Sequence, residues 1–167
     1  MTLEGWFKVP SIADGFLIAR WEDFATNGKC AYYLKIASGG AIEYGIQRGV
    51  NIGASITTTS NIASGTWYHI AATYDGSSVA KIYIDGVEQS TTSSGTWGSV
   101  NAAAGVVLEL GRNQDDGGLS YYNGDMQHVR LSDTPRTAFS YALSAANQPS
   151  VTTGSEVTTQ PPASTAD

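Results

Sequence analysis

The stretch of residues 67–88 constrains the fold more than any other part of the chain. Every second residue from Tyr68 to Tyr74 is apolar, and a period of two is typical of a β-strand with one buried face. Another strand-like run then leads to Asp85-Gly86, a preferred pair for a type I′ hairpin turn, which needs positive φ at both central residues. This stretch therefore predicts consecutive antiparallel strands.

The same signals recur along the chain, where alternating runs are separated by turn-forming pairs such as Asp14-Gly15 and Asp75-Gly76. The 19 glycines and the low share of charged residues, 14%, fit short strands joined by tight turns. Two sheets packed face to face would bury one alternating face of each strand, so we predict an all-β, antiparallel β-sandwich. The expected strands are 2–9, 16–21, 30–37, 41–47, 54–59, 67–74, 79–84, 87–90, 106–110 and 122–131.

Several segments carry a family resemblance. Residues 67–76 have the pattern Trp-x-His-hydrophobic-Ala-x-Thr-Tyr-Asp-Gly, and residues 82–88 read Ile-Tyr-Ile-Asp-Gly-Val-Glu. Residues 3–10 look like an early strand of the same family, and residues 122–131 look like its Gly-x-Ile-Asp-Glu-Val-Arg strand. Together they resemble laminin-G-like domains of the concanavalin-A-like lectin/glucanase superfamily, over roughly residues 2–150. The resemblance implies a concanavalin-A-like jelly roll.

Both ends of the chain depart from the family pattern. Laminin-G-like domains generally have a strand or two before the equivalent of residues 3–9, so the resemblance implies a missing first family strand and an open sheet edge. Residues 150–167 lack aromatic side chains and are rich in Ser, Thr and Pro, which is typical of a tail. We therefore expect one sandwich domain over 1–149 and an extended tail over 150–167, bound to that edge or to a partner chain.

Charge and cysteine content restrict the partners. The chain has 15 acidic and 9 basic residues, a net charge of −6, and its basic residues form no cluster. Phosphate binding depends on clustered Lys and Arg, so nucleic acid is excluded. No apolar stretch approaches the length of a membrane span, and we expect no membrane insertion. Cys30 is the only cysteine, so no disulfide forms within the chain, and its side chain is expected to pack in a strand.

The sequence lacks the motifs of an enzyme. Glucanases of the superfamily carry Glu-x-Asp-x-x-Glu, whose paired carboxylates act as acid and nucleophile, but no Glu here has an Asp two positions later. The Gly-x-Ser-x-Gly, His-Glu-x-x-His and phosphate-loop motifs are also absent. His69 stands where the family usually has a histidine, and we expect a structural residue hydrogen-bonded to neighbouring strands. We predict no catalytic activity.

One loop is rich in oxygen ligands. It contains Asn113, Asp115 and Asp116, and Asp125 follows it. Calcium takes about six to eight oxygen ligands, and the resemblance makes calcium the best-motivated cofactor because many laminin-G-like domains hold one at the rim of the sandwich. The same residue types are ordinary turn formers. A calcium site and a simple turn are therefore both open at this point.

Several aromatic residues could form a platform for a sugar. Such a site needs an aromatic ring against the apolar face of the sugar, with polar groups nearby for its hydroxyls. Trp97 lies between Gly and Ser residues in a long loop and is the best candidate for exposure, although a loop tryptophan can also plug the end of a sandwich. The other candidate glycan-binding residues are Trp21, Asn27, Tyr121 and Tyr122.

Two binding functions remain. The first is a virion structural component, such as a capsid decoration or tail-associated protein, whose partners are other chains of the assembly that contact the open edge and the tail. Its support is that no signal peptide precedes the first strand, since phage structural proteins leave the cell by lysis. The second is a glycan- or cell-surface-binding module of a larger secreted bacterial protein. The expected location is accordingly the virion or the extracellular space.

Overall fold

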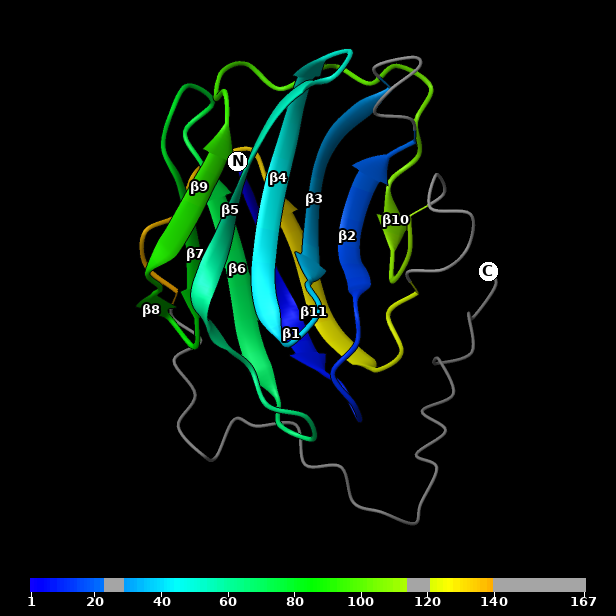
Figure 1. The fold of residues 1–167 in the computed structure, drawn as a ribbon, viewed down its shortest axis with the longest axis vertical. Helices are drawn as coiled ribbons and strands as arrows, with labels where there is room; N and C mark the ends of the chain where they lie inside the picture. Colours follow the sequence, from blue (N-terminus) through cyan, green and yellow to red (C-terminus); the bar gives the residue numbers. More distant parts are fainter. Residues whose placement is uncertain (23–28, 114–120, 140–167) are drawn as a thin grey trace, which may run out of the picture.

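The computed structural model describes residues 1–22, 29–113 and 121–139, which form two antiparallel sheets packed face to face (Figure 1). The five-stranded sheet has the order β11-β1-β6-β7-β8, and the six-stranded sheet, in front in Figure 1, has the order β10-β2-β3-β4-β5-β9. The predicted antiparallel β-sandwich is confirmed. The strands are β1 (Thr2–Lys8), β2 (Gly15–Trp21), β3 (Cys30–Ile36), β4 (Ala41–Gly49), β5 (Ile52–Asn61), β6 (Tyr68–Tyr74), β7 (Ala80–Ile84), β8 (Val87–Glu88), β9 (Thr91–Gly95), β10 (Glu109–Leu110) and β11 (Asp125–Ser132).

The inward-facing residues of both sheets fill the space between them. Phe7 and Ile70 of the five-stranded sheet belong to the same buried cluster as Leu34, Ile42 and Ile56 of the six-stranded sheet. Each such side chain contributes about 1.5–3 kcal/mol when fully buried. Because side chains alternate along a strand, the residues next to these point to the outer faces of the sheets. The two outer faces carry different residues.

The predicted hairpin turn is confirmed. Asp85 and Gly86 have φ values of 51° and 78°, the positive values that a type I′ turn requires, and they join β7 to β8. The Asp85 carboxylate accepts a hydrogen bond from the backbone N–H of His69 at 2.9 Å. The Asp85 N–H in turn donates to the His69 carbonyl at 2.8 Å. The turn is thereby tied to the neighbouring strand β6.

Two expected strands differ clearly from those of the structure, and one strand of the structure was expected as loop. The strand expected at 106–110 is only Glu109–Leu110, because Val106 N–H donates to the Ala103 carbonyl in a turn. The strand expected at 122–131 begins later, at Asp125, and ends at Ser132. Residues 91–95, expected as loop, form β9, whose Ser, Thr and Gly residues pair with β5 through their backbones. Backbone pairing leaves no apolar period in the sequence, which is why the pattern missed this strand.

We expected an open sheet edge at the first strand, and this expectation is wrong for β1. β1 pairs with β6 along one side and with β11 along the other, so it lies inside the five-stranded sheet. The distant strand β11 supplies the hydrogen bonds that an edge would have left unmade. Residues 150–167, expected to fill such an edge, lie outside the described residues. The described residues contain no helix long and apolar enough to span a membrane.

Candidate functional site

A hollow lies on the outer face of the six-stranded sheet. Strand register places Tyr33 of β3 opposite Gly45 of β4, Gly45 opposite Ser55 of β5, and Ser55 opposite Ser94 of β9, in one row across the sheet. The hollow has a volume of about 330 Å³. We call it the trough, and it is lined by Trp21, Tyr33, Ile46, Gly53, Ala54, Ser55, Ser94 and Gly95.

The Tyr33 side chain crosses the sheet because its neighbour on β4 has no side chain. A Cβ atom added at Gly45 would overlap the Cε1 and Cζ atoms of the Tyr33 ring. Glycine at position 45 therefore creates the space in which the ring lies. Glycine inside a strand commonly marks a close approach of this kind.

Aromatic rings gather around Tyr33. The Trp21 ring lies 4.9 Å from the Tyr33 ring, centroid to centroid, at an interplanar angle of 88°. Phe16 lies 5.6 Å from Tyr33 at 75°. Edge-to-face pairs of this geometry are favourable because the positive ring edge meets the negative ring face. The three rings form one group at the β2–β3 side of the trough, with Trp21 and Tyr33 in its lining.

A band of charged groups borders the aromatic group. The Tyr33 hydroxyl donates a hydrogen bond to Glu43 Oε1. Lys35 Nζ lies 3.5 Å from Asp14 Oδ1, 3.8 Å from Glu43 Oε2, and 5.6 Å from the centre of the Phe16 ring. Burial first and the nearby Glu43 carboxylate second raise the pKa of Tyr33, so its hydroxyl stays protonated and keeps its hydrogen bond to Glu43.

The structure brings only part of the predicted aromatic set to the trough. Trp21 lines it, whereas Tyr121 is 55% exposed and pairs with Phe16 in an isolated bridge. Tyr122 is half-buried, and its hydroxyl donates to the Lys8 carbonyl at 2.9 Å. Asn27 lies outside the described residues.

Trp97 packs against the core of the sandwich. Its ring stacks on Tyr44 at 6.5 Å and 15° and lies 5.3 Å from Tyr74, while its Nε1 donates to Ser93 Oγ at 3.0 Å. It does not line the trough. This position corresponds to the alternative considered for a loop tryptophan, that of a plug at the end of the sandwich.

The contribution of Tyr33 could not be recognised from β3 alone. The neighbouring residue Tyr32 packs against the core, so two adjacent tyrosines point to opposite faces of one strand. The available signal lay on another strand, where Gly45 stands among the outward-facing residues, between Glu43 and Gln47. Only the pairing of β3 with β4 connects that glycine to Tyr33.

The predicted calcium ligands are described only in part. Asn113 is 8% exposed, and Asp125 begins β11, where its carbonyl shares the hydrogen bond of the Tyr122 hydroxyl with the Lys8 carbonyl, each at 2.9 Å. Asp115 and Asp116 lie outside the described residues. Within the described ranges, no three His, Cys, Asp or Glu side chains gather as metal ligands would. The calcium site therefore stays a prediction.

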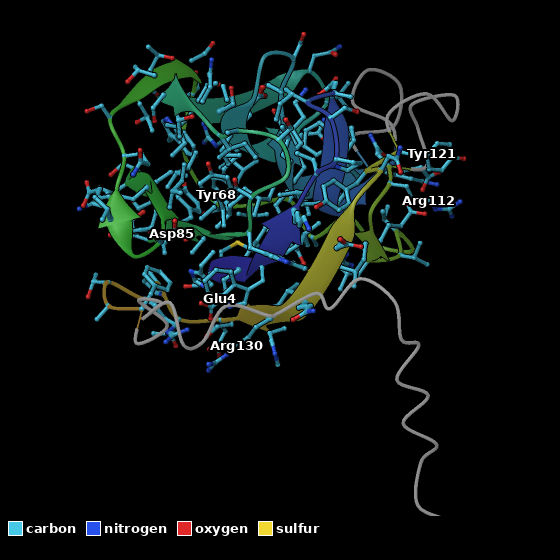
Figure 2. All side chains as sticks on the ribbon, turned by 90° about the horizontal axis from the view of Figure 1, so that it is seen from below. Glu4, Tyr68, Asp85, Arg112, Tyr121 and Arg130 are labelled. Carbon is cyan, nitrogen blue, oxygen red and sulfur yellow. The ribbon has the colours of Figure 1, made fainter. Side chains whose placement is uncertain are left out.

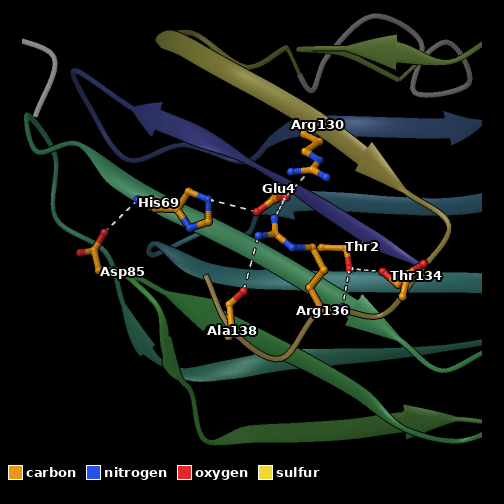
Figure 3. Close-up of polar contacts among 8 residues, drawn as sticks. All are labelled: Thr2, Glu4, His69, Asp85, Arg130, Thr134, Arg136 and Ala138. Atoms are coloured by element: carbon orange, nitrogen blue, oxygen red, sulfur yellow. Dashed lines mark hydrogen bonds and ion pairs between the residues drawn. The ribbon is translucent and has the colours of Figure 1, made fainter. Parts of the chain in front are cut away.

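A second polar cluster lies on the outer face of the five-stranded sheet, around the buried Glu4 (Figure 3). Arg136 Nη1 donates to Glu4 Oε1, Arg130 Nε lies 3.8 Å from the same oxygen, and His69 Nε2 lies 3.4 Å from Glu4 Oε2. Burial lowers the pKa of His69, and the Glu4 carboxylate offsets only part of this effect. The imidazole is therefore mainly neutral at neutral pH, as suits a structural residue.

Residues 133–139, which we call the clasp, cover this cluster. Thr2 Oγ1 donates to the Thr134 carbonyl at 2.7 Å and accepts from the Arg136 N–H at 2.9 Å. The Phe139 ring lies 5.7 Å from His69 and 4.8 Å from Tyr83. The clasp thus ties the segment after β11 to β1, β6 and β7. It leaves this face occupied by the chain itself.

Comparison with known proteins identifies the family of this chain. The model of the concanavalin A-like lectin/glucanases superfamily (Laminin_G_3) matches residues 1–140. A comparison with curated proteins gave no match.

Solved structures of similar fold include two carbohydrate-related proteins. A proposed carbohydrate binding protein from Bacteroides ovatus has a TM-score of 0.61 at 20% identity; the match covers 81% of this chain and 38% of that one. The CBM40 of the Ruminococcus gnavus IT-sialidase has a TM-score of 0.57 at 17% identity, over 79% of this chain and 77% of that one. The same CBM40 bound to α2,3-sialyllactose has a TM-score of 0.55 at 13% identity, covering 75% and 70%. At these sequence identities, the similarity to the solved structures shows a shared fold alone.

Proposed function

Since the chain belongs to the concanavalin A-like lectin/glucanases superfamily, we propose that it is a non-catalytic module that binds glycans in the trough. One observation carries the proposal: Trp21 and Tyr33 stand beside the hydroxyls of Ser55 and Ser94 in one open hollow. A sugar ring presents an apolar C–H face and a rim of hydroxyls. An aromatic group next to polar side chains is complementary to both.

The composition of the trough favours a ligand that lies along the sheet. Gly53 and Gly95, which have no side chains, line the trough on the β5 and β9 side, and the aromatic rings come from β2 and β3. Backbone N–H and C=O groups and serine hydroxyls are suitable partners for sugar hydroxyls. The volume of about 330 Å³ is at the lower end of ligand sites, which span roughly 300–1,000 Å³. The trough therefore suits one or two sugar rings.

The structural relatives support the glycan hypothesis over the virion hypothesis. The solved structures described above include proteins named for carbohydrate binding, and one of them is bound to α2,3-sialyllactose. The chain spans only 38% of the length of the Bacteroides ovatus protein. A binding module inside a larger extracellular protein is consistent with that share. A role in a virion receives no comparable support.

A glycan array tests the proposal. We expect wild-type protein to be retained on at least one glycan and Trp21→Ala to reduce that retention about tenfold or more, since the variant removes an aromatic wall of the trough. Trp97→Phe is the matched tryptophan control, because Trp97 packs on Tyr44 and Tyr74 away from the trough lining. It is expected to lower the melting temperature and to leave retention unchanged. Wild-type protein without any retained glycan would refute the proposal.

A further inference from the structure

We infer that the trough selects uncharged sugars and rejects glycans whose contacting ring carries a carboxylate. The inference rests on the proposed function and specifies its ligand class. A carboxylate moved from water into a partly enclosed site needs a cation or several N–H donors to replace its hydration. Whether the trough can bind a carboxylate therefore depends on where the lysine and arginine side chains lie.

All nine basic side chains fall within the described residues, and none of them lines the trough. Six lie within 4 Å of a carboxylate of the protein itself. The guanidinium of Arg20 donates to the carbonyls of Ala103 and Val106. The guanidinium of Arg48 occupies the place that a Cβ atom at Gly98 would take, and Lys8 ends β1 on the other sheet. The basic residues are Lys8, Arg20, Lys29, Lys35, Arg48, Lys81, Arg112, Arg130 and Arg136.

Lys35 is the cation next to the aromatic group, and two carboxylates already compensate its charge. Its Nζ lies between Asp14 at 3.5 Å and Glu43 at 3.8 Å, and its side chain is only 19% exposed. Glu43 also accepts the hydrogen bond from Tyr33. The local sum over Lys35, Asp14 and Glu43 is negative. A carboxylate on the ligand would therefore meet repulsion at this border of the trough, whereas Glu43 can accept hydrogen bonds from neutral hydroxyls.

The rest of the sequence adds only negative charge. Residues 23–28 and 114–120, which lie outside the described ranges, contain three aspartates and neither Lys nor Arg. Residues 140–167 also contain neither. No part of the chain can therefore bring a further lysine or arginine to the trough. This distinguishes the expected ligand from the α2,3-sialyllactose bound to the Ruminococcus gnavus relative.

The test compares neutral glycans with matched acidic ones on the same array. Lactose and α2,3-sialyllactose form one pair, and neutral xylo-, manno- and cello-oligosaccharides are set against oligogalacturonides. For the glycans that Trp21→Ala no longer retains, we expect at least tenfold higher retention of neutral than of acidic members. Retention should change less than twofold between 50 and 500 mM NaCl, because no ion pair forms.

A variant with an added cation sharpens the test. Ser94 lines the trough from β9, so Ser94→Lys is expected to raise retention of acidic glycans at least fivefold, and Ser94→Gln is the uncharged control of similar length. The charge inference would be overturned if the wild type retained acidic glycans as well as or better than neutral ones and if Trp21→Ala lost that retention. The proposed function would then remain intact. Absence of any retained glycan would overturn both.

Discussion

The outer face of one sheet is covered by the chain, whereas the outer face of the other is open. On the five-stranded sheet the clasp covers Glu4 and His69, both 2% exposed, and the chain satisfies its own charged groups. On the six-stranded sheet the outward-facing residues leave a hollow bordered by Trp21 and Tyr33. Figure 2 shows Glu4 and Arg130 on the side of the five-stranded sheet that faces away from the six-stranded one.

The two faces show that polar groups can serve either the fold or a ligand. A buried carboxylate is tolerable only with partners in place, so the Glu4 cluster requires Arg136 and has no room for a ligand. The trough instead combines half-buried aromatic rings with hydroxyls that solvent can reach. His69 matched a family position in the sequence, yet the face that carries it is closed. The open face contains residues outside the family motif.

The largest effect is expected from removing the main partner of Glu4. Arg136→Met should lower the free energy of unfolding by about 3 kcal/mol, because the buried carboxylate loses the guanidinium that bonds it. Arg130→Met is the control, since Arg130 is 53% exposed and 3.8 Å from the same oxygen; it should cost less than about 1 kcal/mol. Urea unfolding measures both, and equal losses would contradict the distinction. Glycan retention should be unchanged in each.

A methyl group in the sheet should close the open face. Gly45→Ala should displace the Tyr33 ring, which its new Cβ would overlap, and reduce glycan retention at least tenfold with a stability loss of about 1–2 kcal/mol. Gly49→Ala on the same strand is the matched control because an added Cβ there meets nothing within 4 Å. Array retention and thermal melting measure the two effects. Unchanged retention in Gly45→Ala would show that the ring position is irrelevant to binding.

The hydroxyl of Tyr33 should contribute a smaller amount. Tyr33→Phe removes the donor to Glu43 and should lower the free energy of unfolding by about 1 kcal/mol and weaken glycan retention. Tyr32→Phe makes the same chemical change on the opposite face of β3 and should leave retention unaltered. Titration calorimetry with a retained glycan resolves the two. A stronger effect of Tyr32→Phe on affinity would place the site elsewhere.

The smallest effect is a pH dependence confined to the covered face. Because burial lowers the pKa of His69 in the folded state, the unfolded chain binds more protons as the pH falls through the ordinary histidine pKa of about 6.5, and stability decreases. The loss attributable to one such histidine between pH 7 and pH 6 is up to about 0.7 kcal/mol. His69→Asn should remove this part of the slope in urea unfolding. The exposed His128 is the control, and a His128→Asn variant that lost the same slope would exclude His69 as its source.

The sequence supported the fold better than the site. Alternation from Tyr68 to Tyr74 and the Asp85-Gly86 turn are local features, and both are found as expected. Trp21 could be suspected as an aromatic residue flanked by polar ones. Tyr33 could not, because its role depends on a glycine that is twelve residues away in the chain and opposite it in the sheet.

The antiparallel sandwich follows from the sequence alone, because alternation and turn pairs are properties of neighbouring residues. Tertiary structure alone decided which outer face is closed and which is open. The clasp reaches Glu4 across 132 positions of sequence, and the trough gathers residues from β2 to β9. Strand order brings such distant side chains together, and no local period encodes strand order.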